Sequence, residues 1–243
     1  MKKALSLLLA LIVLTGCRTA SDNSGLGMRI SKKEVSWKNS IIEFSALREN
    51  NGFAGQNPAV RVKMKYQDGK RINMPIDDTG LGYGSSFPRG TLGFYKPDQG
   101  LAKAEILSKT ADKMTILLSY NKWTIYDEPV SLDKQITLFR DTPLMEVYDY
   151  YEGNFELLNV AAGLTTALVG KITEIDKGFS IYYPPYDVTS VIIMPDANGT
   201  VVNESFGEAM LTKEVVSGQP IHYFVGISDK GLDYLLEELT KIM

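Results

Sequence analysis

Glu146, Tyr148 and Tyr150 alternate along a short run of the chain, and alternate residues of a β-strand share one face. A carboxylate beside two phenols can transfer protons or bind hydroxyl groups. A glycosidase needs a second carboxylate about 5 to 9.5 Å away. The sequence offers three candidates for that role: Asp127, Glu128 or Asp149. In a regular strand Asp149 points to the opposite face, and a solvated strand face explains the same pattern.

His222 is the one histidine of the chain. On an extended strand it shares a face with Phe224, whereas Tyr223 points the other way. Imidazole titrates near neutral pH and can relay protons. A hydrogen-bonded structural histidine is the alternative. The candidate catalytic residues are therefore Glu146 and His222.

The segment 77–90, DDTGLGYGSSFPRG, is rich in glycine. It lacks the Gly-Lys-Ser/Thr of a phosphate-binding loop, and Pro88 opposes the helix that such a loop requires. We interpret it as a connecting loop or as a loop beside a sugar site. In the second case Tyr83, Phe87 and Arg89 contact the sugar.

The densest aromatic cluster contains Tyr182, Tyr183 and Tyr186, beside two prolines, and Trp123 is a further aromatic candidate. Aromatic rings stack on the apolar faces of sugar rings, and exposed apolar patches mark binding surfaces. Core packing explains the same residues, so both interpretations stay open.

Composition argues against several other kinds of chemistry. One cysteine and one histidine cannot supply a structural zinc site, and the spaced oxygen ligands of an EF-hand loop do not occur. We expect no metal and no cofactor. The 26 basic and 29 acidic side chains give a net charge of −3 without blocks of one sign. The expected partners therefore do not include nucleic acid.

The elements that must position these residues are mostly strands. Short β-like runs separated by Gly, Pro, Asn and Asp recur up to about residue 227, with no helical spacers between them. Leucines at helical spacing over residues 232–242 predict one C-terminal helix, with Asp229 as N-cap and Glu237 and Glu238 on the solvent side. The predicted fold is mainly β, an antiparallel β-sandwich with a short C-terminal α-helix.

The N-terminus resembles a bacterial lipoprotein signal. Lys2 and Lys3 precede an apolar run over residues 4–14, and Leu14-Thr15-Gly16-Cys17 resembles a lipobox. The run is shorter than the roughly 20 residues that span a bilayer, which is typical of a signal peptide. The resemblance implies cleavage before Cys17 and acyl chains on that cysteine. An ordinary cleaved signal or a buried helix is the alternative.

These features divide the chain into three parts. We expect a lipoprotein signal peptide over 1–16, a lipidated flexible tether over 17–27 and a single β-sandwich domain over 28–243. The lipid would attach the protein to a membrane of the bacterial cell envelope, at the outer membrane or on the periplasmic side.

Residues 114–152, MTILLSYNKWTIYDEPVSLDKQITLFRDTPLMEVYDYYE, resemble the galactose-mutarotase-like β-supersandwich. Three further runs are similar to an uncharacterised family of bacterial lipoproteins associated with polysaccharide utilisation: ELLNVAAGLTT (156–166), KGFSIYYPP (177–185) and HYFVGISDKGLDYLLEEL (222–239). The resemblance implies the supersandwich fold and a carbohydrate context. Mutarotases use more than one histidine, so it does not extend to their chemistry.

The leading hypothesis is therefore a lipid-anchored envelope protein that binds polysaccharide or oligosaccharide. One alternative is a glycoside lyase or hydrolase of the same fold, in which Glu146 or His222 transfers a proton and Arg89 or Arg140 neutralises a uronate. The other is a non-catalytic envelope protein that contacts other proteins.

Overall fold

A computed structural model describes residues 25–32, 34–47, 60–65, 71–73, 84–91, 93–95, 101–166, 171–203 and 208–243. The predictions for the signal peptide, for Cys17 and for the tether before residue 25 lie outside these ranges, as does the prediction for Tyr83. Within the described ranges, no helix is long and apolar enough to cross a membrane.

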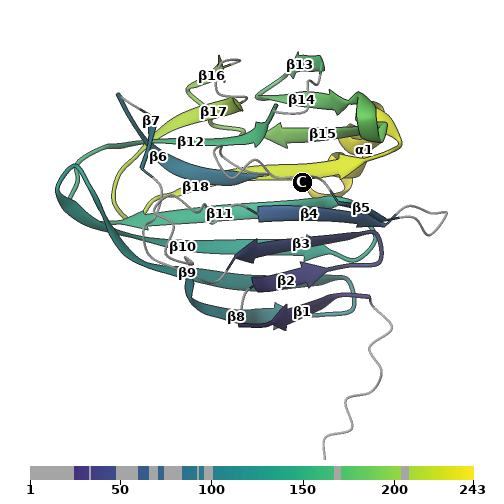
Figure 1. The fold of residues 1–243 in the computed structure, drawn as a ribbon, viewed down its shortest axis with the longest axis horizontal. Helices are drawn as coiled ribbons and strands as arrows, with labels where there is room; N and C mark the ends of the chain where they lie inside the picture. Colours follow the sequence, from purple (N-terminus) through teal and green to yellow (C-terminus); the bar gives the residue numbers. More distant parts are fainter. Residues whose placement is uncertain are drawn as a thin grey trace, which may run out of the picture.

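Antiparallel strands form three sheets that pack as a β-sandwich (Figure 1). The largest sheet has eight strands, in the order β13 (Lys171–Ile175), β14 (Gly178–Tyr183), β15 (Val188–Ile193), β18 (Pro220–Ser228), β11 (Leu144–Glu152), β10 (Glu128–Phe139), β9 (Lys113–Ile125) and β8 (Leu101–Lys109).

Each of the other two sheets has five strands. One runs β1 (Gly27–Ile30), β2 (Glu34–Lys38), β3 (Ile42–Leu47), β4 (Val60–Lys65) and β5 (Arg71–Asn73). The other runs β16 (Gly199–Asn203), β17 (Glu208–Val215), β12 (Leu158–Thr165), β6 (Ser85–Gly90) and β7 (Gly93–Phe94). One hydrophobic core contains residues of all three sheets, among them Trp37, Ile136 and Leu211.

The sequence dictates this arrangement through alternation. In β9, every second residue from Met114 to Tyr120 is buried, whereas Thr115, Leu117 and Ser119 between them are half-buried. The large sheet thus has an inner face against the core and an outer face. β15 is the exception, since all six of its residues are buried.

The outer side of β15 is covered by α1 (Gly231–Ile242), the one α-helix within the described ranges. Leu235 and Leu239 pack on Val191 of β15 and Phe224 of β18 in a second apolar cluster. A short 3₁₀ turn, η1 (Pro184–Tyr186), links β14 to β15. The predicted mainly β, antiparallel sandwich with one C-terminal helix is confirmed.

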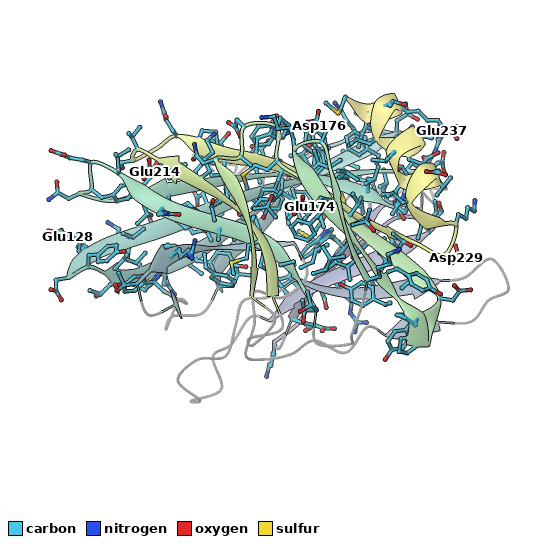
Figure 2. The ribbon with its side chains drawn as sticks, turned by 90° about the horizontal axis from the view of Figure 1, so that it is seen from above. Glu128, Glu174, Asp176, Glu214, Asp229 and Glu237 are labelled. Carbon is cyan, nitrogen blue, oxygen red and sulfur yellow. The ribbon has the colours of Figure 1, made fainter. Side chains whose placement is uncertain are left out.

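Two details of the helix prediction are wrong. The N-cap residue is Lys230 rather than Asp229, and its side chain makes no capping hydrogen bond. Glu238 is 7 % exposed, and its carboxylate accepts a hydrogen bond of 2.6 Å from Lys241. Glu238 therefore lies at the edge of the buried stripe of α1. Its neighbour Glu237 is exposed and lies on the solvent side of the helix (Figure 2).

Leu235→Ala tests how much α1 contributes to the fold. Leu235 is fully buried against the sheet, so its truncation should lower the free energy of unfolding by about 2–5 kcal/mol in urea denaturation. Glu237→Ala, on the exposed side of the same helix, is the control and should change it by less than about 0.5 kcal/mol. Equal effects of the two changes would show that α1 does not pack on the sheet.

Candidate functional site

Among the described elements, α1 packs on the outer face of the large sheet over β15, over the adjacent β18 and, to a smaller extent, over β11. Beyond the helix, the register of β9, β10, β11 and β18 aligns ten mostly polar side chains in cross-strand rows. We call these residues the polar face: Thr115, Leu117, Ser119, Asp133, Gln135, Thr137, Glu146, Tyr148, Tyr150 and His222.

Glu146, Tyr148 and His222 form the centre of the polar face, so the structure brings the two predicted catalytic residues together. His222 Nε2 lies 3.0 Å from Glu146 Oε1, and the Tyr148 hydroxyl donates to the same oxygen at 3.2 Å. The rings of Tyr148 and His222 stack with centroids 4.2 Å apart and planes 3° apart. Phe224, which packs with α1, meets His222 edge-on at 4.8 Å.

This geometry sets the protonation states of the cluster. The hydrogen bond from His222 is the main influence that lowers the pKa of Glu146, and partial burial opposes it. Burial, followed by the Glu146 charge, raises the pKa of the Tyr148 phenol. Near neutral pH the cluster therefore offers an ionised carboxylate as acceptor and a protonated phenol.

The polar face does not supply the second carboxylate of a glycosidase. Asp149 points to the inner face, as predicted. Asp133 is the other carboxylate among the ten residues. It lies four residues along β10 from Thr137, the cross-strand partner of Glu146, which corresponds to about 13 Å along the strand. That separation exceeds the 5 to 9.5 Å of catalytic pairs. Glu128 lies at the end of the sandwich opposite α1 (Figure 2).

A second polar cluster, which sequence reasoning missed, is buried on the inner face. Lys134 Nζ contacts Asp149 Oδ2 at 2.6 Å, with the two side chains 2 % and 0 % exposed. Tyr223 donates to the same carboxylate oxygen at 2.9 Å, and Ser86 of β6 donates to it as well. Ser86 also bonds the Tyr151 hydroxyl at 2.6 Å. We call these five residues the buried cluster.

The buried cluster joins the large sheet to β6. The Tyr223 hydroxyl oxygen also lies 3.0 Å from the carbonyl oxygen of Gly84, the residue immediately before the strand that carries Ser86. Burial lowers the pKa of the Lys134 ammonium, and the Asp149 charge opposes this shift. The signal in the sequence was alternation, since Lys134 and Asp149 occupy inward positions of β10 and β11.

Three predicted sugar contacts are buried and do not present a ring to a ligand at the surface. Phe87, Trp123 and Tyr183 are 1 %, 4 % and 0 % exposed. Phe87 packs with Ala161 and Met210, whereas Trp123 and Tyr183 belong to the main core. For Trp123 and Tyr183 the core-packing alternative is correct, because apolar rings on inward positions are removed from water. Phe87 lies in strand β6 and not in the loop predicted for this segment.

The remaining predicted contacts do not join the polar face. Tyr182 is exposed on β14, separated from β11 by β15 and β18, and donates to Asp187. Tyr186 packs partly against the main core from η1. The backbone carbonyl of Arg89 in β6 accepts a hydrogen bond of 3.2 Å from Tyr126.

Comparison with known proteins shows the fold alone. No protein-family model and no curated protein matches this chain. Among solved structures, it is similar to an active YidC insertase (TM-score 0.53, 10 % identity, 84 % of this chain and 40 % of that one) and to YidC from Thermotoga maritima (0.52, 12 %, 84 % and 50 %). It is also similar to the GH36 alpha-galactosidase AgaB from Geobacillus stearothermophilus (0.50, 11 %, 87 % and 42 %). The chain spans half or less of each of these proteins.

Removing one partner of the buried ion pair should destabilise the protein strongly. Lys134→Met leaves the Asp149 charge buried without its cation and should lower the free energy of unfolding by about 3–5 kcal/mol. Adding Asp149→Leu should recover a large part of that loss. Lys103→Met, which breaks an exposed pair with Glu105, is the control and should cost less than about 1 kcal/mol. A Lys134→Met protein as stable as the wild type would contradict the buried pair.

The titration of Glu146 tests the centre of the polar face. In the wild type its carboxyl carbon should titrate below the ordinary value of 4.5, and His222→Phe should move the pKa upward by removing the main stabilising hydrogen bond. Because the pKa is depressed in the folded state, stability from this contact is present above 4.5 and is lost as the pH falls through the depressed value. Heteronuclear NMR measures both titrations, and an unshifted Glu146 in the wild type would refute the contact.

Proposed function

We propose that this chain is a lipid-anchored protein of the bacterial cell envelope that binds polysaccharide or oligosaccharide on its polar face. The observation that carries the proposal is the stacked Tyr148–His222 pair beside the ionised Glu146 on an uncovered sheet face. It combines an amphipathic ring pair with a charged hydrogen-bond acceptor, and both groups are fixed on neighbouring strands.

The surrounding rows match the needs of a polyhydroxylated ligand. Each sugar hydroxyl can donate and accept, and the row through Tyr148 presents the Gln135 amide, which does both. In the next row the hydroxyl of the half-buried Thr115 lies 3.1 Å from that of the buried Thr137, so Thr115 is the one nearer the surface. Charge-assisted hydrogen bonds to Glu146 would be the strongest of these contacts.

Binding without turnover fits the electrostatics. A general acid at Glu146 would need a raised pKa, and His222 lowers it. The likeness to a GH36 alpha-galactosidase supports a carbohydrate context at the level of fold. The lipobox-like Leu14–Cys17 supports the anchor, with lipid on Cys17 after removal of residues 1–16.

Glycan-array screening followed by calorimetry tests the binding proposal. The chain should bind at least one plant, algal or host glycan, and Tyr148→Ala and Gln135→Ala should each weaken that binding at least tenfold. Tyr182→Ala, an exposed tyrosine on β14 distant from the polar face, is the matched control and should leave binding unchanged. A full array without binding, or equal losses in all three variants, would overturn the proposal.

A second candidate is a lyase, favoured by the contact of 3.0 Å between His222 and Glu146, a proton-transfer pair beside a tyrosine. A lyase also needs a cation that neutralises the uronate, and neither predicted arginine belongs to the polar face. The predicted Arg140 lies in the turn before β11, where it pairs with Asp141 and Asp112, and Arg89 lies on β6. Cleavage of uronate-rich polysaccharide that is lost in His222→Gln would establish this alternative.

A further inference from the structure

A surface cavity lies on the opposite side of the sandwich, on the outer face of β1, β2 and β3. Trp37 and Phe44 of these strands point into the core, so the alternate residues point outward. The cavity has a volume of about 290 Å³ and is lined by Gly27, Met28, Arg29, Ser36, Lys38 and Glu43.

The register arranges the outward residues in two rows. Arg29, Ser36 and Ser45 form one row, and Gly27, Lys38 and Glu43 form the other. On β4 the rows continue to the register positions of Arg61 and Lys63. Four of the positions on these two rows therefore carry basic residues, against one acidic residue.

The basic side chains at the cavity make no ion pair. Across the described ranges, neither Arg29 nor Lys38 has a carboxylate within salt-bridge distance, although Glu43 is the register partner of Lys38. Other surface cations of the described part do have one: Lys103 pairs with Glu105 and Lys213 with Asp196. Two exposed and unpaired cations around a cavity attract an anion.

A row of two serines lies next to Arg29 at the cavity. Ser45 is 2 % exposed, and its Oγ has no hydrogen-bond partner in the described part of the chain. It lies beside the cavity-lining Ser36, which is 8 % exposed, in the row that begins with Arg29. Ser45 itself does not line the cavity, so Ser36 is the hydroxyl of this row that a bound anion can reach.

We propose that this cavity binds the sulfate, phosphate or carboxylate group of a sugar-sized ligand. The planar guanidinium of Arg29 donates two parallel hydrogen bonds to such a group, and Lys38 adds a point charge. The hydroxyl of Ser36, which lines the cavity, donates to a remaining oxygen. Glu43 accepts a hydrogen bond from a neighbouring hydroxyl of the ligand, which favours an anionic sugar over a bare anion. The site is separate from the polar face and does not depend on the function proposed for that face.

Isothermal titration of the full chain tests the proposal with galactose 6-sulfate, glucuronate, inorganic sulfate and neutral galactose. The two anionic sugars should bind more tightly than inorganic sulfate, and galactose should not bind at this cavity. Arg29→Gln and Lys38→Gln should each weaken anionic-sugar binding at least fivefold, and raising the salt concentration should weaken it in the wild type. Lys103→Gln, an exposed cation paired with Glu105, is the matched control and should have no effect.

Three results would overturn the proposal. In the first, none of the anions binds. In the second, Lys103→Gln weakens anionic-sugar binding as much as Arg29→Gln does. In the third, the chain binds phosphatidylglycerol vesicles through Arg29 but does not bind the anionic sugars. The last result would assign the surface to a lipid headgroup. The losses in Arg29→Gln and Lys38→Gln separate this site from the polar face, since neither residue lies on that face.

Discussion

The structure depends on one constraint, the period of two along the strands of the eight-stranded sheet. Inward positions of β9, β10 and β11 are apolar with few exceptions, so this face must be removed from water along its whole width. No single partner sheet covers it, and the two five-stranded sheets share one continuous core with it. Among the described strands, the outer face is covered most fully at β15, where α1 packs on it. The polar face is the part of this outer face on which α1 does not pack.

The exceptions on the inner face explain how the layers hold their relative positions. Apolar contacts between sheets are not directional, and a set of leucines would tolerate small shifts. Lys134 and Asp149 are different, because a buried charge is tolerated only where its partner and its hydrogen bonds are in place. Ser86 and Gly84 bring β6 into the same network, so its hydrogen bonds fix β6 over β10, β11 and β18. The cluster therefore specifies the layer register more than it adds net stability.

The parts of the fold that the sequence predicted are local ones. Alternation placed Glu146 and Asp149 on opposite faces, and leucine spacing located α1. The contact between Glu146 and His222 was not predictable, because the two residues are 76 positions apart in the sequence and meet only when β11 pairs with β18. The choice between core and sugar contact stayed open for the aromatic rings for a related reason. Phe87, Trp123 and Tyr183 suit a core and a sugar platform equally well, and only the identity of the covering sheet decides between them. Glu238 was placed in water because periodicity does not show how wide the buried stripe of α1 is.

The same partial cover accounts for the kind of chemistry that the polar face favours. Its central residues lie on the middle strands of a long sheet, hydrogen-bonded on both sides, so they cannot close around a substrate as a loop does. Glu146 is already satisfied by His222 and Tyr148, which stabilises its ionised form and reduces its value as an acid. A rigid, open and ionised face loses little entropy when it binds an extended ligand, and it offers no means of excluding water from a reaction. Those properties favour recognition over catalysis, whichever glycan the face takes.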